Sequence, residues 1–204
     1  MKLRGKTLTW RATPRTLRLA ALPVLPLALL AGCGGSSDPG LPQLTAASPA
    51  TLKSCSDLAS RINFANTRIT AAAPVDAGTL TVAGKPVRAH CQVTGKRCER
   101  VSPVDGKNYA IGFEMRLPND WNGRFFYQAN GGSDGSVVTA TGAVNGGGGL
   151  DNALNMGFAV ISSDAGHEAA GGPTFGIDPQ ARLDFGYQAV AKLTPMAKSA
   201  IQTA

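Results

Sequence analysis

Strict alternation of apolar and polar residues predicts one strand clearly, over residues 108–117. A period of two residues places one side of a strand in a core. Residues 124–129 predict a second strand, and residues 158–161 predict a third, buried one. The second strand carries three consecutive aromatic residues, which is typical of a central strand covered on both faces: Phe125, Phe126 and Tyr127.

Shorter elements precede these strands. Ser54 is expected to cap a short helix, with Asp57 three residues further on. Residues 67–73, 79–82 and 86–94 are each predicted as a strand.

A glycine-rich loop over residues 130–149 follows the aromatic strand. Loops of this length inside a domain are usually functional or mobile. Residues 150–156 then predict a short helix, with Gly157 in the position that ends it.

A long helix is predicted to begin at Asp178 and Pro179, a cap followed by a proline in the first turn. Pro195 is expected to kink or split this helix. Apolar residues at steps of three and four predict its buried face: Leu183, Tyr187, Val190, Ala197 and Ile201.

From residue 108 the order is strand, strand, loop, helix, strand and helix, which favours a parallel sheet with right-handed crossovers. We therefore expect an α/β fold with a mostly parallel sheet and an N-terminal antiparallel portion. A further strand should follow the long helix, but the sequence ends at Ala204. The expected fold is thus a partial one, truncated before that strand.

The run from Trp121 to Ser133 predicts a tight turn, an apolar strand and a glycine loop. An α/β-hydrolase takes one N–H of its oxyanion hole from such a loop. Gly132 is the candidate donor, because a glycine backbone can approach a substrate closely. An ordinary flexible turn explains the same glycines equally well.

The segment from Gly131 to Gly135 also spells the G-x-S-x-G pattern of a serine nucleophile. That pattern needs a helix directly after the serine, and the residues after Ser133 are poor helix formers. We therefore reject Ser133 as the nucleophile.

Three further residues are candidates for site chemistry. His167 follows a strand end, and we expect it to fasten its loop by hydrogen bonds, since the chain offers no nucleophile for it to activate. Asp164 lies where ligands bind in open sheets, but we favour a loop-structuring carboxylate. His90 is interpreted as structural.

Residues 1–33 have the proportions of a signal peptide, with six basic residues, no acidic residue and a short apolar stretch. They end in Leu30-Ala31-Gly32-Cys33, which resembles a lipoprotein cleavage box and predicts lipidation of Cys33. The alternative is an ordinary signal peptide with a chance cysteine. Residues 34–50 are expected to form a flexible tether, and residues 51–204 one domain.

The charge balance changes once the leader is set aside. The chain has 20 Lys and Arg against 13 Asp and Glu, and the six basic residues of the leader leave 14 against 13. No basic patch remains that would indicate nucleic-acid binding. The cysteines lack the CxxC spacing of a zinc site, and we expect no metal and no cofactor.

Five segments together resemble the tannase/feruloyl esterase family, over residues 52 to 204. They begin at His90-Cys91-Gln92, Trp121-Asn122-Gly123, Asn130-Gly131-Gly132, Ser163-Asp164-Ala165 and Phe175-Gly176-Ile177. The similarity is greatest to its mono(2-hydroxyethyl) terephthalate hydrolase branch.

The resemblance implies a partial α/β-hydrolase fold and an exported serine carboxylic-ester hydrolase acting on small aromatic acid esters. It implies a disulfide between Cys55 and Cys91, and the oxyanion role for the N–H of Gly132. Cys98 departs from the family pattern; it is free or pairs with an absent part.

The family's Gly-Cys-Ser-x-Gly-Gly nucleophile turn, acid, His-Cys pair and lid are absent from this sequence. We therefore expect a fragment that is inactive alone and lacks the C-terminal part of its polypeptide. We expect the protein to be secreted or to lie in the bacterial cell envelope. In the envelope it would be attached to the membrane through its lipid anchor only. The alternative is a lipid-anchored, non-catalytic binding module derived from the same fold.

Overall fold

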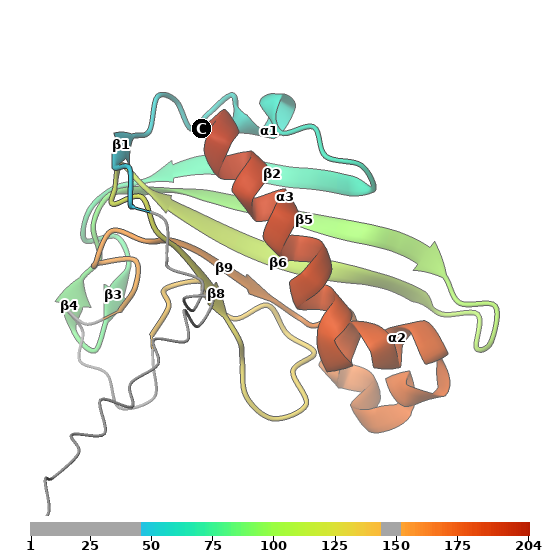
Figure 1. The fold of residues 1–204 in the computed structure, drawn as a ribbon. Helices are drawn as coiled ribbons and strands as arrows, with labels where there is room; N and C mark the ends of the chain where they lie inside the picture. The colour runs from blue at the N-terminus through green and yellow to red at the C-terminus, as the bar shows by residue number, and fades with distance from the viewer. Residues whose placement is uncertain (1–45, 144–151) are drawn as a thin grey trace, which may run out of the picture. The chain divides into compact units, whose positions relative to one another are not determined.

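A computed structural model describes residues 46–143 and 152–204. The predicted signal peptide, the lipidation site Cys33 and most of the tether lie outside the described residues. The described chain is built on one five-stranded sheet with the order β2-β5-β6-β9-β8 (Figure 1). Its strands are β2 (Thr67–Val75), β5 (His90–Val101), β6 (Asn108–Pro118), β8 (Phe125–Gln128) and β9 (Ala159–Ser163).

Smaller elements surround this sheet. β1 (Ala50–Thr51) pairs with β7 (Asp120–Trp121), and β3 (Thr81–Val82) pairs with β4 (Lys85–Pro86). The helical elements are α1 (Leu58–Arg61), the 3₁₀ segment η1 (Ala169–Ile177), α2 (Pro179–Leu183), the π-helical turn η2 (Asp184–Gln188) and α3 (Ala189–Thr203). No helix of the described residues is long and apolar enough to cross a membrane.

The sheet is mixed. β2, β5, β6 and β9 pair antiparallel in turn, whereas β8 pairs parallel with β9. The antiparallel portion is therefore the larger part of the described sheet, contrary to the predicted mostly parallel sheet, and the parallel part is the aromatic strand β8 with β9. β8, predicted as a central strand, forms an edge within the described residues, and its three aromatic side chains are only half-buried.

The alternating pattern of β6 is confirmed. Its apolar positions Ile111, Phe113 and Met115 are almost fully buried, and α3 covers this face of the sheet (Figure 1). Gly95 of β5 lies opposite Phe113, and a Cβ atom there would lie 2.6 Å from the Phe113 ring. The missing side chain of Gly95 thus makes room for the aromatic ring.

Two predicted helices differ in the structure. The first begins at Leu58 rather than after Ser54, and no side chain caps it. Residues 152–157 form turns instead of a helix. The reason is that the amides of Ala153 and Leu154 donate to the carbonyls of Gly142 and Thr141 in the glycine loop, and not to a helix of their own.

The predicted strand 86–94 also shifts, and β5 begins at His90. The residues before it turn toward the β3–β4 hairpin, because the Val87 amide donates to the Leu80 carbonyl at 2.9 Å. β2, by contrast, continues through Pro74 to Val75.

The predicted cap of the long helix is confirmed. The Asp178 side chain accepts a hydrogen bond from the Ala181 amide at 2.6 Å, and Pro179 occupies the first turn. Arg100 of β5 binds both carboxylate oxygens, at 2.9 and 2.5 Å. Hydrogen bonding from Arg100 holds the pKa of Asp178 well below its usual range.

The break in this helix is wrongly predicted. α3 runs through Pro195, with Leu193 and Met196 fully buried on either side of it, and the irregularity is the π-helical turn at Asp184–Gln188. An extra residue in a turn rotates the following side chains by about 100°. The buried face of α3 is therefore formed by Ala189, Leu193, Met196, Ala197 and Ala200.

The predicted apolar face holds only in the second half of α3. Ala197 is buried and Ile201 packs against the core, but three predicted core residues are 41–60% exposed: Leu183, Tyr187 and Val190.

The disulfide between Cys55 and Cys91 is confirmed, with a Cα–Cα distance of 5.5 Å. It ties the segment before α1 to the buried start of β5. Cys98 forms no disulfide with another described residue.

We predict that Cys55→Ala lowers the free energy of unfolding by about 2–4 kcal/mol, because the open chain gains conformational freedom when unfolded. Urea denaturation followed by circular dichroism measures this difference. The matched control is Cys98→Ala, which breaks no disulfide and should stay within about 1 kcal/mol of the unmodified chain. Equal stabilities for the two variants would contradict the prediction.

Candidate functional site

The site is the edge of the sheet at which the parallel strands β8 and β9 end. Ligands bind beyond the C-terminal ends of such strands. The Asn130 side chain, just after β8, donates hydrogen bonds to the Ser162 hydroxyl at 3.1 Å and to the Ser163 carbonyl at 2.8 Å. The start of the glycine loop is thereby fixed to the end of β9.

Two buried or half-buried polar side chains hold the rest of the described loop. Gln128 accepts a hydrogen bond from the Gly142 amide at 2.7 Å and donates to the Thr139 carbonyl. Glu114 of β6 accepts from the Ala140 amide at 2.9 Å. Sequence reasoning missed both residues: Glu114 occupies one of the polar positions of an alternating strand, and Gln128 ends the aromatic strand.

Gly132 lies in the turn directly after β8, at this edge. Its φ is +68°, which favours glycine, and an added Cβ atom would find nothing within 4 Å. No described residue accepts a hydrogen bond from its amide. Its oxyanion role stays a prediction.

Ser133 lies in the same exposed turn and not at the start of a helix. Within the described residues, no serine hydroxyl or cysteine thiol is hydrogen-bonded to a histidine ring. The described part of the site thus holds no activated nucleophile.

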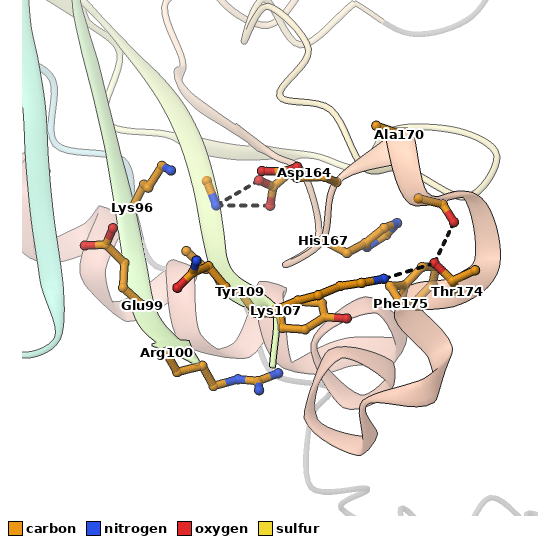
Figure 2. Close-up of a pocket in the computed structure, with 15 residues that line it drawn as sticks. Lys96, Glu99, Arg100, Lys107, Tyr109, Asp164, His167, Ala170, Thr174 and Phe175 are labelled. Carbon is orange, nitrogen blue, oxygen red and sulfur yellow. Dashed lines mark hydrogen bonds between the residues drawn. The ribbon is translucent and has the colours of Figure 1, made fainter. Parts of the chain in front are cut away.

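Asp164, just after β9, is held by backbone amides. Its carboxylate accepts from the Gly112 amide at 3.0 and 3.1 Å (Figure 2). It also accepts from the Gly166 amide at 2.8 Å. Burial raises the pKa of Asp164 to about 6, and the amide hydrogen bonds oppose this shift. A Cβ atom at Gly112 would lie 2.5 Å from the carboxylate. The expectation of a loop-structuring carboxylate agrees with these contacts.

His167 is fastened differently from the expectation. Its ring is 3% exposed and stacks on Phe175, with a centroid distance of 3.7 Å, while Phe185 meets it edge-on. Its Nδ1 atom is buried and has no hydrogen-bond partner among the described residues. Aromatic packing, and not the expected side-chain hydrogen bonds, therefore fixes the His167 ring.

His90 is structural, as predicted. Its Nδ1 donates to the Arg88 carbonyl at 2.7 Å, and its Nε2 accepts from Arg116 at 2.5 Å, a tautomer assigned from these partners. Burial lowers the pKa of His90, which keeps the ring neutral.

A cavity of ≈ 830 Å³ opens beside Asp164 and His167. Lys96 and Tyr109 line one side of it, and Phe175 lies on the other (Figure 2). Gly132 is not among its lining residues. Among the residues that the structure describes, no group of three or more His, Cys, Asp or Glu side chains could hold a metal ion.

The described sheet and its loop edge define an α/β-hydrolase-like fold. A crystal structure of an esterase from Aspergillus oryzae shares it, with a TM-score of 0.57 and 22% sequence identity. That match covers 73% of this chain and 29% of the esterase. Feruloyl esterase B from the same organism gives a TM-score of 0.56 at 23% identity, over 73% of this chain and 28% of the other.

Comparison of the sequence with known families identifies the family of proteins within this fold. The family model for tannase and feruloyl esterase matches residues 91–204, and the chain belongs to this family. It is 40% identical over 145 residues to a mono(2-hydroxyethyl) terephthalate hydrolase from Piscinibacter sakaiensis. The aligned residues cover 67% of this chain and 24% of that protein.

A probable feruloyl esterase B from Emericella nidulans is 29% identical over 139 residues, which cover 67% of this chain and 25% of the relative. The chain thus spans about a quarter of the length of these curated relatives.

We predict that Asp164 stabilises the fold more as the pH falls. Its pKa of about 6 when folded exceeds the ordinary 3.8, so the folded state binds more protons between these values. Between about pH 6 and pH 4, the stability advantage of the unmodified chain over Asp164→Asn should grow by up to about 2 kcal/mol, after discounting for solvent screening.

Urea denaturation at several pH values measures this advantage. Glu168→Gln, which changes an exposed neighbouring carboxylate, is the control. Parallel stability curves for the unmodified chain and Asp164→Asn would contradict the prediction.

Proposed function

We propose that this chain forms part of an exported serine ester hydrolase that cleaves small aromatic acid esters, and that Gly132 supplies one N–H of its oxyanion hole. The observation that carries the proposal is the Gly132 amide, which lies beyond the C-terminal end of β8. This amide donates no hydrogen bond to any described residue. Membership of the tannase and feruloyl esterase family supports the ester chemistry.

In this proposal a serine from a further part of the polypeptide attacks the ester carbonyl. The negative charge that develops on the carbonyl oxygen meets the Gly132 N–H, which needs no rearrangement to donate a hydrogen bond. The Asn130 side chain fixes the start of the turn that carries this amide. Gln128 and Glu114 hold the later part of the loop, at Gly142 and Ala140. The lipoprotein-type leader supports export and anchoring at the cell envelope.

The chain of 204 residues is expected to be inactive alone, because its described residues hold no nucleophile–base contact. Hydrolysis of methyl gallate by the purified chain, followed by release of gallate, tests this. Ser133→Ala is the decisive variant: turnover that this substitution abolishes would show that Ser133 is a nucleophile and overturn the proposal.

A polypeptide that continues in frame beyond Ala204 provides the test of Gly132. Its Gly132→Ala variant should lose about 10² in kcat/KM, because alanine is strained at a φ of +68° and the amide moves. Gly131→Ala is the matched control, since an added Cβ atom there also meets nothing within 4 Å and no positive φ is needed. Equal losses in both variants would contradict the oxyanion role.

A further inference from the structure

The outward side of the last helical segment is apolar in its first half. Five exposed residues follow one another at the spacing of a single helix face, and we call them the apolar face: Leu183, Gly186, Tyr187, Val190 and Ala191. Seven and eleven residues after Ala191, the same side of the helix carries Lys198 and Gln202, which are also exposed. The outward side therefore changes from apolar to polar along its length.

The inward side of this segment is buried against the sheet. Ala189 and Leu193 are at most 2% exposed and belong to the core that α3 covers (Figure 1). From residue 183 to residue 197 the sequence has two charged residues, Asp184 and Lys192, and these bind each other at 2.5 Å. A helix that is apolar on both sides is typical of one enclosed by protein, and not of one at a surface.

The apolar face adjoins the candidate site. Phe185 lies between two of its members in the sequence and meets the rings of His167 and Phe175, at centroid distances of 5.4 and 5.3 Å. Both of these rings line the cavity beside Asp164 (Figure 2). A layer of protein that covered the apolar face would therefore lie next to this cavity.

The composition of the face indicates the kind of partner. Single exposed apolar residues are ordinary, but an apolar face without charges marks an interaction surface. Permanent interfaces resemble a domain core cut in two, whereas transient ones are more polar. The aligned part of the chain amounts to 24% and 25% of the length of two curated relatives. A polypeptide of that length has ample further chain to act as a permanent partner.

We propose that the continuation of the polypeptide beyond Ala204 packs apolar side chains on Leu183, Tyr187 and Val190. Gly186 lies between these larger residues, and an added Cβ atom there would find nothing within 4 Å, so the partner can approach the helix closely. The polar half of the outward side stays in water. The inference rests on the proposed function in one respect, that the polypeptide continues, and it does not depend on the ester chemistry.

Hydroxyl-radical footprinting with mass spectrometry tests the apolar face without any turnover. Tyr187 is 60% exposed in the described fold. Its rate of oxidation should be roughly tenfold lower in the longer, in-frame polypeptide than in the chain of 204 residues, because it becomes a core side chain. Tyr109, which is 7% exposed, is the matched control and should react slowly in both.

A charge placed on the face provides the second measurement. Tyr187→Asp should lower the midpoint of thermal unfolding of the longer polypeptide, because a carboxylate without a partner would be buried. In the chain of 204 residues the same variant should shift the midpoint by no more than about 2 °C, since the position is exposed. Gln202→Asp, in the polar half, should leave both midpoints unchanged.

Equal oxidation of Tyr187 in the two proteins would overturn the inference. A chain of 204 residues that sediments as a dimer and already protects Tyr187 would assign the face to a second copy, and would overturn it as well. Protection of Tyr187 without ester hydrolysis would support the inference and count against the proposed function. Ester hydrolysis with Tyr187 still exposed would count against the inference alone.

Discussion

The parallel pairing of β8 with β9 is the constraint on which the site depends. Because both strands end at the same edge, two loops that are more than thirty residues apart in the sequence start beside one another. Asn130 exploits this proximity by binding the last residues of β9. If β8 were paired antiparallel, the glycine turn and Asp164 would lie at opposite ends of the sheet.

The rigidity of the glycine loop comes from side chains outside its apex. Glu114 and Gln128 bind loop amides from the strands, and Asp164 binds the amides of β6 and of its own loop. The exposed glycines of the turn have no side chain with which to hold themselves. The proposed donor role of Gly132 needs an amide that is both accessible and fixed.

Much of the fold could be predicted from local pattern. The alternation of β6 and the Asp178 cap depend on neighbouring residues alone, and both are confirmed. The helix predicted over residues 150–156 is wrong. The amides of Ala153 and Leu154 bind the carbonyls of Gly142 and Thr141, a tertiary contact that no local pattern contains. The disulfide came from family resemblance. Gln128 and Glu114 were missed as site residues, since they act by binding amides of the glycine loop across the fold.

The π-helical turn at Asp184–Gln188 has a consequence for aligning relatives of this chain. One additional residue there separates two stretches of helix that each keep a regular spacing. A relative without it would keep Leu193 and Met196 equivalents against the sheet only if its alignment carried a one-residue gap before α3. An ungapped comparison would match core positions with solvent-facing ones, and so would understate the kinship of two identical folds.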